Sequence, residues 1–551
     1  MKNKKRFLNY RFSLLLLFYS VIQVNAQTCG SANSSLSLHH QETVDNFPSW
    51  YPGCSQYLGD INIGFPGITN LDSLSVLTSI SGKLGIYNTS LADLNGLSNL
   101  TVVGKGLDVT SNTQLIHVDG LSNLTSVGEN LYFYNNANLN NVEALTNITF
   151  VGKDLHFSSN NLLTSLPNFN QLTSVGRHLI IGGSSFNDLG GLEYITSVGG
   201  WLDISFNNKL TSLNGLSGID SVGGKLNISS NSKVSNLSGL EGITTVGGDI
   251  EIGGNNLLED LSSLSGITKI GGNLRVSNNA LLTNLYGLGS IDTIGGIIIS
   301  YNPMLTSLDG LSMGSSLSGD IIIQANNNLL NINALSGIVS CGGLIIKDNY
   351  LLKNIGGLLS LNSINNNLEI VNNNSLTSLN GLNNLYYVGG NLDVSGNPNY
   401  TIEGLSAITT INGNLKMAYN VNLLNLNAFS NLDRVGGNID VSYNYKLGLM
   451  GISDFCGLSS LFSAPSPNGL IGNYAISNNA LNPTISEIIN NGLCEFYQIG
   501  LLKYRTLNDA INAGGSPILL INNVVESVPV VIPEGRTLII SNPFKLTYIG
   551  N

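Results

Sequence analysis

A unit of 23 or 24 residues recurs along most of the 551-residue chain, and this repeat constrains the fold more than any other feature. The stretches Val127–Val142 and Val435–Leu447 show its pattern, an aliphatic residue and a glycine-rich pair followed by x-Leu-x-Ile-x-x-Asn-x-x-Leu. One asparagine per unit marks the register, and only one serine breaks the column: Asn88, Asn112, Asn136, Asn160, Ser184, Asn207, Asn231, Asn255, Asn279, Asn302, Asn326, Asn349, Asn373, Asn397, Asn420, Asn444. Self-similarity at a fixed period of this length is the signature of a repeat architecture. The sequence therefore predicts a solenoid of stacked coils.

The repeat also predicts what each part of a coil does. The Leu-x-Ile segment alternates with a period of two, which indicates a short strand with two inward side chains. One coil cannot bury its apolar face alone, but stacked coils share a continuous core. The asparagine amides are expected to stack at a bend and to satisfy buried polar groups. The paired glycines suit a positive φ or a tight corner. Stacking at about 4.8 Å per coil predicts a rod on the order of 80 Å long.

The Leu-x-Ile-x-x-Asn segment is close to the leucine-rich repeat, Leu-x-x-Leu-x-Leu-x-x-Asn. Here the preceding aliphatic residue lies one position further back, with Gly-Gly between. The unit is similar to the receptor L-domain repeats of insulin and EGF receptor ectodomains. It most resembles long arrays of such repeats in secreted bacterial proteins, especially from Bacteroidetes. The resemblance covers residues 57–450. It implies an all-β solenoid, right-handed and β-helix-like, with short helical caps and with any ligand on a sheet face.

The first 26 residues have the form of a signal peptide. Five Lys or Arg residues precede or flank the apolar run Ser13–Ile22, and Val24, Asn25 and Ala26 form a small-residue cleavage site. No later segment is apolar enough to span a bilayer, so there is no predicted transmembrane segment. The formal net charge is −11, which argues against a nucleic-acid or anionic-membrane partner. We expect a secreted or cell-surface protein.

The cysteines flank the repeats. Cys29 and Cys54 precede them, and Cys456 and Cys494 follow them, so in an oxidising compartment we expect one disulfide at each end. Cys341 falls at a buried repeat position and is expected to be a free core thiol. No Cys-x-x-Cys pair is present, which argues against a zinc or thioredoxin-type site.

The expected organisation has five parts: a signal peptide at 1–26, a disulfide cap at 27–56, the solenoid at 57–450, a C-terminal cap at 451–500 and a second unit at 501–551. The repeat pattern fails from Ile452, and Ala480–Asn490 is a helix candidate within the cap. In the last part a short helix at 506–513 precedes three β-rich runs, 518–522, 528–532 and 537–541. This part resembles the opening turn of a pectin-lyase-like parallel β-helix, and we expect it to be truncated.

The outward residue in the middle of each predicted strand varies from coil to coil, and neighbours are expected about 5 Å apart. A first cluster combines aromatic and polar side chains: Tyr132, His156 and Ile180, with Tyr134, Asp154, His178 and Trp201 nearby. Such a face suits contact with a sugar or a protein. The alternatives are a metal site, or an ordinary varied face with a surface salt bridge between Asp154 and His178.

Two further clusters occupy the same column. Ile298, Ile322 and Ile345 form an outward apolar row, which either faces a partner or a crossing loop or reflects β-propensity alone. The charged row is Glu369, Asp393, Lys416 and Asp440. The neighbouring carboxylates of Glu369 and Asp393 match the spacing of a retaining glycosidase or a hard-cation site. The favoured interpretation is a charge ladder neutralised by Lys416, because an open face does not shift carboxylate pKa values as catalysis requires.

No catalytic motif accompanies the repeats. The five histidines are scattered, and the sequence lacks Gly-x-Ser-x-Gly, His-Glu-x-x-His and a phosphate loop. We therefore predict a non-enzymatic protein without cofactor or metal, which acts in adhesion or binds an extracellular glycan or protein. The alternatives are a non-catalytic region of a larger polysaccharide-degrading enzyme and a passive surface spacer.

Overall fold

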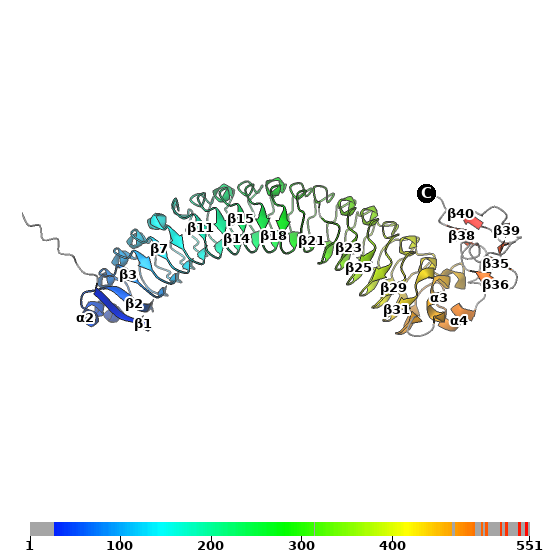
Figure 1. Ribbon diagram of the computed structural model, residues 1–551, viewed down its shortest axis with the longest axis horizontal. Helices are drawn as coiled ribbons and strands as arrows, with labels where there is room; N and C mark the ends of the chain where they lie inside the picture. The colour runs from blue at the N-terminus through cyan, green and yellow to red at the C-terminus, as the bar shows by residue number, and fades with distance from the viewer. Residues whose placement is uncertain are drawn as a thin grey trace, which may run out of the picture.

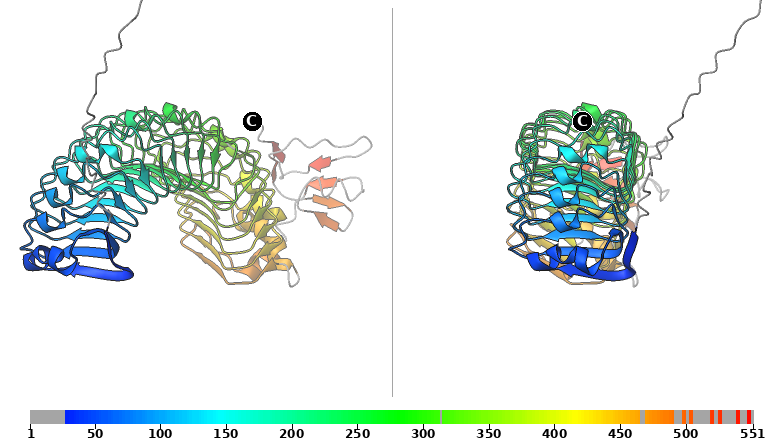
Figure 2. Two further views of the ribbon diagram at one scale, coloured as in Figure 1. Left: turned by 60° about the vertical axis from the view of Figure 1, so that its left-hand side comes forward. Right: turned by 90° about the vertical axis from the view of Figure 1, so that its left-hand side faces the viewer.

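A computed structural model describes residues 27–312, 314–464 and 469–490, together with the backbone of six short strands between 497 and 548. The coils follow one another along an arc from the N-terminal strands to the C-terminal helices (Figure 1). Viewed from the N-terminal side, successive coils overlie one another with the same flattened cross-section (Figure 2, right). Within the described ranges, no helix has the length and apolarity needed to cross a membrane. The predicted signal peptide lies outside the described residues.

Two parallel ladders of strands run along the arc. The strands of the first ladder pair in register with one strand per coil, and they are β1 (Gln27–Leu38), β2 (Cys54–Gly64), β4 (Leu84–Tyr87), β6 (Leu107–Thr110), β8 (Leu131–Tyr134), β10 (Leu155–Ser158), β12 (Leu179–Gly182), β14 (Leu202–Ser205), β16 (Leu226–Ser229), β18 (Ile250–Gly253), β20 (Leu274–Ser277), β21 (Ile297–Ser300), β22 (Ile321–Gln324), β24 (Leu344–Lys347), β26 (Leu368–Val371), β28 (Leu392–Ser395), β30 (Leu415–Ala418), β32 (Ile439–Ser442) and β34 (Tyr474–Ser477). This ladder and the first part of the second form a 28-stranded sheet. The prediction of a solenoid of stacked parallel strands is confirmed.

The second ladder consists of two-residue strands and divides into two stretches. The first stretch is β3 (Ser79–Ile80), β5 (Val102–Val103), β7 (Ser126–Val127), β9 (Phe150–Val151), β11 (Ser174–Val175), β13 (Ser197–Val198), β15 (Ser221–Val222), β17 (Thr245–Val246) and β19 (Lys269–Ile270). The second forms a separate six-stranded sheet of β23 (Ser340–Cys341), β25 (Ser363–Ile364), β27 (Tyr387–Val388), β29 (Thr410–Ile411), β31 (Arg434–Val435) and β33 (Gly469–Leu470). Between the two stretches lie isolated bridges, among them Lys269–Thr293 and Ser316–Ser340, which continue the line of the second ladder.

Helical turns form much of the remaining side of the coils. The 3₁₀ turns are η1 (Asp72–Leu74), η2 (Asn95–Leu97), η3 (Asp119–Leu121), η4 (Glu143–Asn147), η5 (Asn214–Leu216), η6 (Ser262–Leu264), η7 (Asn333–Leu335), η8 (Gly356–Leu358), η9 (Glu403–Leu405), η10 (Asn427–Asn431) and η11 (Ile452–Leu458). The α-helices lie near the two ends and are α1 (Gln41–Asp45), α2 (Phe47–Trp50), α3 (Ser459–Ser463) and α4 (Ile485–Asn490).

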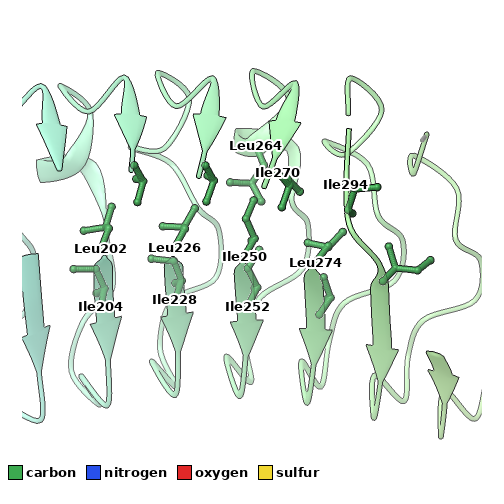
Figure 3. Close-up of a cluster of buried hydrophobic side chains, with 14 of the residues drawn as sticks. Leu202, Ile204, Leu226, Ile228, Ile250, Ile252, Leu264, Ile270, Leu274 and Ile294 are labelled. Atoms are coloured by element: carbon green, nitrogen blue, oxygen red, sulfur yellow. The ribbon is translucent and has the colours of Figure 1, made fainter. Parts of the chain in front are cut away.

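The core is a repeated set of inward aliphatic side chains. Figure 3 shows pairs such as Leu202 and Ile204 from one strand aligned with Leu226 and Ile228 from the next. These side chains are fully buried. Full burial of one such side chain stabilises the fold by about 1.5–3 kcal/mol, and every coil repeats the contribution. The intervening strand positions point outward, which leaves them available for function.

The asparagine column forms a continuous hydrogen-bonded ladder along most of the arc. In a typical step the backbone N–H of Asn136 donates to Oδ1 of Asn160 at 3.0 Å, and Nδ2 of Asn136 donates to the carbonyl of Val109 at 2.9 Å. The prediction that stacked amides satisfy buried polar groups is confirmed. The predicted register was wrong at its first member. Thr89, rather than Asn88, occupies the ladder position and donates to Asn112.

The glycine pairs serve close stacking. Of the two expected reasons for them, positive φ was wrong, whereas the pairs do lie at the bends that precede the strands of the first ladder. A Cβ on Gly247 would lie 2.1 Å from the carbonyl oxygen of Gly223 in the preceding coil. The left-handed residue is instead the one directly before the ladder asparagine, as at Phe206 (φ 59°) and Tyr301 (φ 56°). The bend at the strand end requires this conformation, so even bulky residues adopt it.

The two ends extend the stacking beyond the repeats recognised in the sequence. At the N-terminus β1 pairs in parallel with β2, and a disulfide joins Cys29 to Cys54. At the C-terminus β34 pairs with β32, and Asn479 continues the ladder by accepting the N–H of Asn444 at 2.9 Å. The expectation that the pattern fails from Ile452 therefore missed one further coil. That coil is longer than the others because it contains η11 and α3.

The remaining expectations concern the C-terminal cap, the cysteines and the residues after 500. Helix α4 lies inside the predicted helical stretch, and Cys341 is free and buried, with burial raising the pKa of its thiol to about 12. Cys494, and with it the predicted second disulfide, lies outside the described residues. So do the predicted helix at 506–513 and the run 528–532. The described strands here are β35 (Tyr497–Ile499), β36 (Leu502–Tyr504), β37 (Ile518–Leu520), β38 (Val524–Glu526), β39 (Leu538–Ile540) and β40 (Leu546–Tyr548).

Candidate functional site

The first predicted cluster lies together on the outward side of β8, β10, β12 and the start of β14. Tyr132, His156 and Ile180 are direct cross-strand neighbours. The rings of Tyr132 and His156 meet edge to face at 5.1 Å, and the ring of Tyr134 lies 6.2 Å from that of His156. The surface formed by Tyr132, Tyr134, His156, His178, Ile180 and Trp201 is called the aromatic face below.

The buried carboxylate of Asp154 holds two residues of the aromatic face in place through hydrogen bonds. Asp154 is only 2% exposed, and its two oxygens accept hydrogen bonds from Nε and Nη2 of Arg177, each at 2.6 Å. The hydroxyl of Tyr132 and the backbone N–H of His178 donate to the same carboxylate. The alternative of an Asp154–His178 salt bridge was wrong, because Arg177 from the adjacent position of the same coil reaches the carboxylate in a bidentate geometry.

His178 has a different role on this face. Its Nδ1 accepts the backbone N–H of Trp201 at 2.8 Å, and its ring lies 4.7 Å from the indole. Because Nδ1 is the acceptor, a neutral imidazole here carries its proton on Nε2. The contact holds the Trp201 ring at the edge of the face, where it remains half exposed at 50%.

The environment sets the charge states of three groups on the face. Burial alone would raise the pKa of Asp154, but hydrogen bonds from Arg177 and Tyr132 outweigh it and lower the pKa below its usual value. The pKa of Tyr132 is raised to about 12, first by burial and then by its bond to the Asp154 carboxylate. Burial lowers the pKa of His156, against the opposing effect of nearby carboxylates. At neutral pH the face therefore holds a carboxylate, a phenol and a neutral imidazole.

Next to Tyr132, towards the N-terminus, the sheet surface contains a cavity of about 200 Å³ that sequence reasoning missed. The cavity is called the Gly106 hollow, and its lining residues are Asp60, Lys83, Lys105, Gly106, Asp108, Glu129, Asn130 and Tyr132. A signal was present in the sequence, because glycine replaces a side chain at a position where neighbouring coils carry lysine and asparagine.

The two other predicted clusters also lie in register. Ile298, Ile322 and Ile345 are cross-strand neighbours and are each partly exposed. In the charged row, Nζ of Lys416 lies 3.1 Å from Oδ2 of Asp393, which favours the charge-ladder interpretation. Across the part of the chain that the structure describes, no three His, Cys, Asp or Glu side chains are grouped so as to hold a metal ion.

A larger, open hollow of about 350 Å³ lies away from the strand face. It is lined by Glu143, Leu166, Asn168, Gly190, Gly191, Glu193 and Tyr194. Its two carboxylates and its tyrosine are exposed to solvent, and none of them is held by a buried partner of the kind that fixes Asp154. We therefore regard the aromatic face and the Gly106 hollow, rather than this larger hollow, as the candidate functional site.

Comparisons with known proteins find similarity among solved structures. No protein-family model matches the chain, and no curated protein matches it. The crystal structure of the TLR13–ssRNA13 complex is similar at 14% identity, covering 79% of this chain and 76% of that chain, with a TM-score of 0.26. An internalin (inlF) from Listeria monocytogenes is similar at 15% identity, covering 81% and 84%, with a TM-score of 0.22. At these TM-scores neither likeness bears on the site or on its ligand.

Proposed function

We propose that this chain is an exported, non-catalytic adhesion protein that binds an extracellular glycan on its aromatic face. The observation that carries the proposal is a row of half-exposed rings on a rigid sheet whose charges are already compensated. Tyr134 is 45% exposed and Trp201 is 50% exposed, while the carboxylate between their strands is paired with Arg177. Exposed aromatic side chains with fixed polar groups beside them are the usual composition of a binding surface.

The charge arrangement favours an uncharged ligand over a charged one. The ion pairs at the aromatic face and the neighbouring coils towards the N-terminus include Lys83–Asp108, Lys105–Asp60, Lys153–Glu129 and Arg177–Asp154. A surface that attracts a polyanion needs uncompensated basic side chains. A polyhydroxyl ligand needs donors and acceptors in alternation, together with a flat apolar surface for its C–H groups. The aromatic face and its border provide both.

The same geometry supports binding without catalysis. A glycosidase acid needs a carboxyl group that is protonated near neutral pH, which requires a raised pKa. The buried carboxylate of this face, Asp154, has a lowered pKa because Arg177 and Tyr132 stabilise its charged form. The signal-peptide pattern and the Cys29–Cys54 disulfide support export, because disulfides persist in oxidising compartments.

The test uses the mature chain and its Tyr134→Ala and Trp201→Ala variants with a panel of polysaccharides. The matched control is Tyr286→Ala, which removes a tyrosine of similar exposure, 56%, from elsewhere on the solenoid. We expect the parent chain and the control to be retained on a polysaccharide and both face variants to lose retention, with no release of reducing ends. Release of reducing ends contradicts the non-catalytic proposal. Retention that survives both face substitutions contradicts the assignment of the site.

A further inference from the structure

The Gly106 hollow exists because residue 106 has no side chain. Gly106 directly precedes β6, at the position that Lys83 occupies in the preceding coil and Asn130 in the following coil. Both of those residues line the hollow from either side. Gly106 is therefore its floor, and a larger residue at this position would fill it.

The fold itself does not require glycine at this position. The φ of Gly106 is not positive, and a Cβ added to it would approach no atom closer than the carbonyl oxygen of Asn130 at 3.4 Å, an ordinary contact. The contrast is Gly128, where a Cβ would lie 1.9 Å from the carbonyl oxygen of Gly104. Neither backbone conformation nor close stacking explains Gly106, but the open space above it does.

The walls of the hollow present paired charges. Nζ of Lys83 lies 2.8 Å from Oδ2 of Asp108, and Nζ of Lys105 lies 3.6 Å from Oδ1 of Asp60. Glu129 is paired with a lysine outside the hollow, at 3.1 Å. Ammonium donors and carboxylate acceptors therefore both line the hollow, and each carboxylate there is paired with a lysine. This arrangement matches the neighbouring hydroxyl groups of an uncharged sugar ring, which donate and accept in turn.

Tyr132 connects the hollow to the aromatic face. Its ring borders the hollow on one side and contacts the His156 ring at 5.1 Å on the other, and its hydroxyl is fixed by Asp154. We infer that the Gly106 hollow holds one uncharged sugar residue of a glycan whose remaining residues lie across the aromatic face towards Trp201. This inference rests on the proposed function and assigns one end of the same binding site.

The experiment measures Kd for uncharged hexasaccharides of glucan, mannan, galactan and xylan, with polygalacturonate and heparin as charged probes. The variants are Gly106→Val, which fills the hollow, and Gly106→Ala, which adds the smallest side chain. The control is Gly337→Val, because Gly337 is exposed and has no atom within 4 Å of an added Cβ. Thermal unfolding of every variant checks that the solenoid is intact. If Gly106→Val does not fold, Gly106→Ala supplies the comparison.

We expect Gly106→Val to raise Kd for the bound hexasaccharide at least tenfold, Gly106→Ala to raise it less, and Gly337→Val to leave it unchanged. Binding to the parent chain should change by less than twofold between 50 and 500 mM salt, because no net charge is recognised. If Trp201→Ala abolishes binding while both Gly106 variants bind like the parent chain, the hollow is not a subsite and the proposed function stands. Binding of the charged probes alone overturns the inference, and binding of none overturns both it and the proposed function.

Discussion

Ser184 and Asn207 occupy the same position on adjacent coils, and Oδ1 of Asn207 is buried there without a hydrogen-bond partner. Elsewhere in the ladder the preceding coil supplies donors to this oxygen, as Nδ2 and the backbone N–H of Asn112 do for Asn136. Ser184 accepts the N–H of Asn160 through its Oγ, but it has no side-chain amide to donate to Asn207, and its backbone N–H does not bond to Oδ1 of Asn207 either. The ladder is therefore continuous on both sides of one defective step.

Replacing Ser184 with asparagine should repair this step. The new Nδ2 would reach Oδ1 of Asn207, and the new Oδ1 would keep the bond from Asn160. Satisfying a buried acceptor is worth about 1–2 kcal/mol, so we expect Ser184→Asn to raise the unfolding temperature. Ser184→Ala should lower it, because the N–H of Asn160 would then lose its acceptor. Equal unfolding temperatures for the two variants would show that water already satisfies both groups.

Because the glycines of adjacent coils stack closely, adding a single methyl group to one of them should lower the stability of the fold markedly. In Gly247→Ala the added Cβ would lie 2.1 Å from the carbonyl oxygen of Gly223, so adjacent coils must separate. Overpacking of this kind costs about 1–3 kcal/mol. The matched control is Gly337→Ala, which meets no atom within 4 Å. Urea denaturation of the two variants measures the difference, and similar midpoints would contradict the stacking role of the glycine.

The disulfide at the N-terminal end should act locally. It closes a segment with a sequence separation of 25 residues, and its loss is expected to destabilise the fold by about 2–4 kcal/mol. Coils of a solenoid contact mainly their neighbours, so the loss should appear first in β1 and β2. Hydrogen exchange of a Cys29→Ser, Cys54→Ser variant should be faster there and unchanged near β26. Uniform acceleration along the chain would instead indicate one cooperative unit.

His156 predicts a specific dependence of stability on pH. Its folded pKa is lowered, first by burial, with Asp154, Asp203 and Asp108 acting in the opposite direction. A histidine with a lowered folded pKa contributes stability that is present above its unfolded pKa of about 6.5 and is lost as pH falls through the folded value. The unfolding temperature of His156→Gln should therefore fall less between pH 7.5 and pH 5 than that of the parent chain. The exposed His39→Gln serves as the control for loss of one imidazole, and equal slopes in all three proteins would contradict the prediction.

The sequence determined the strand register because the repeat has one unambiguous marker per coil. The alignment of Tyr132, His156 and Ile180 followed directly from that register and is present in the structure. The pairing of Asp154 with Arg177 did not follow from it, because a long side chain reaches between columns and its direction depends on the surrounding packing. A period identifies which backbone positions are neighbours, but it does not identify which side-chain atoms meet.

The Gly106 hollow and the last coil were missed for two other physical reasons. Glycines were interpreted from the sequence as residues needed for a particular backbone conformation. At Gly106 the relevant property is instead the missing side chain, which leaves space above the backbone. The coil that ends in β34 was not recognised because Asn444 and Asn479 are 35 residues apart instead of 23 or 24. The inserted residues, which include helices, interrupt the repeat period. Stacking tolerates such an insertion on one side of a coil provided that the strand and its asparagine remain in place.

The alternation of inward and outward residues along the first ladder makes the proposed binding surface modular in one dimension. Each coil contributes one outward side chain to a row with a spacing of about 4.8 Å, while the inward residues are nearly interchangeable from coil to coil. Removal or duplication of one whole coil between Gly106 and Trp201 would thus change the separation of the two ends of the site by a single step and leave the core composition the same. In the proposed binding mode, the distance between the Gly106 hollow and Trp201 is therefore set by the number of coils and is adjustable in units of one repeat.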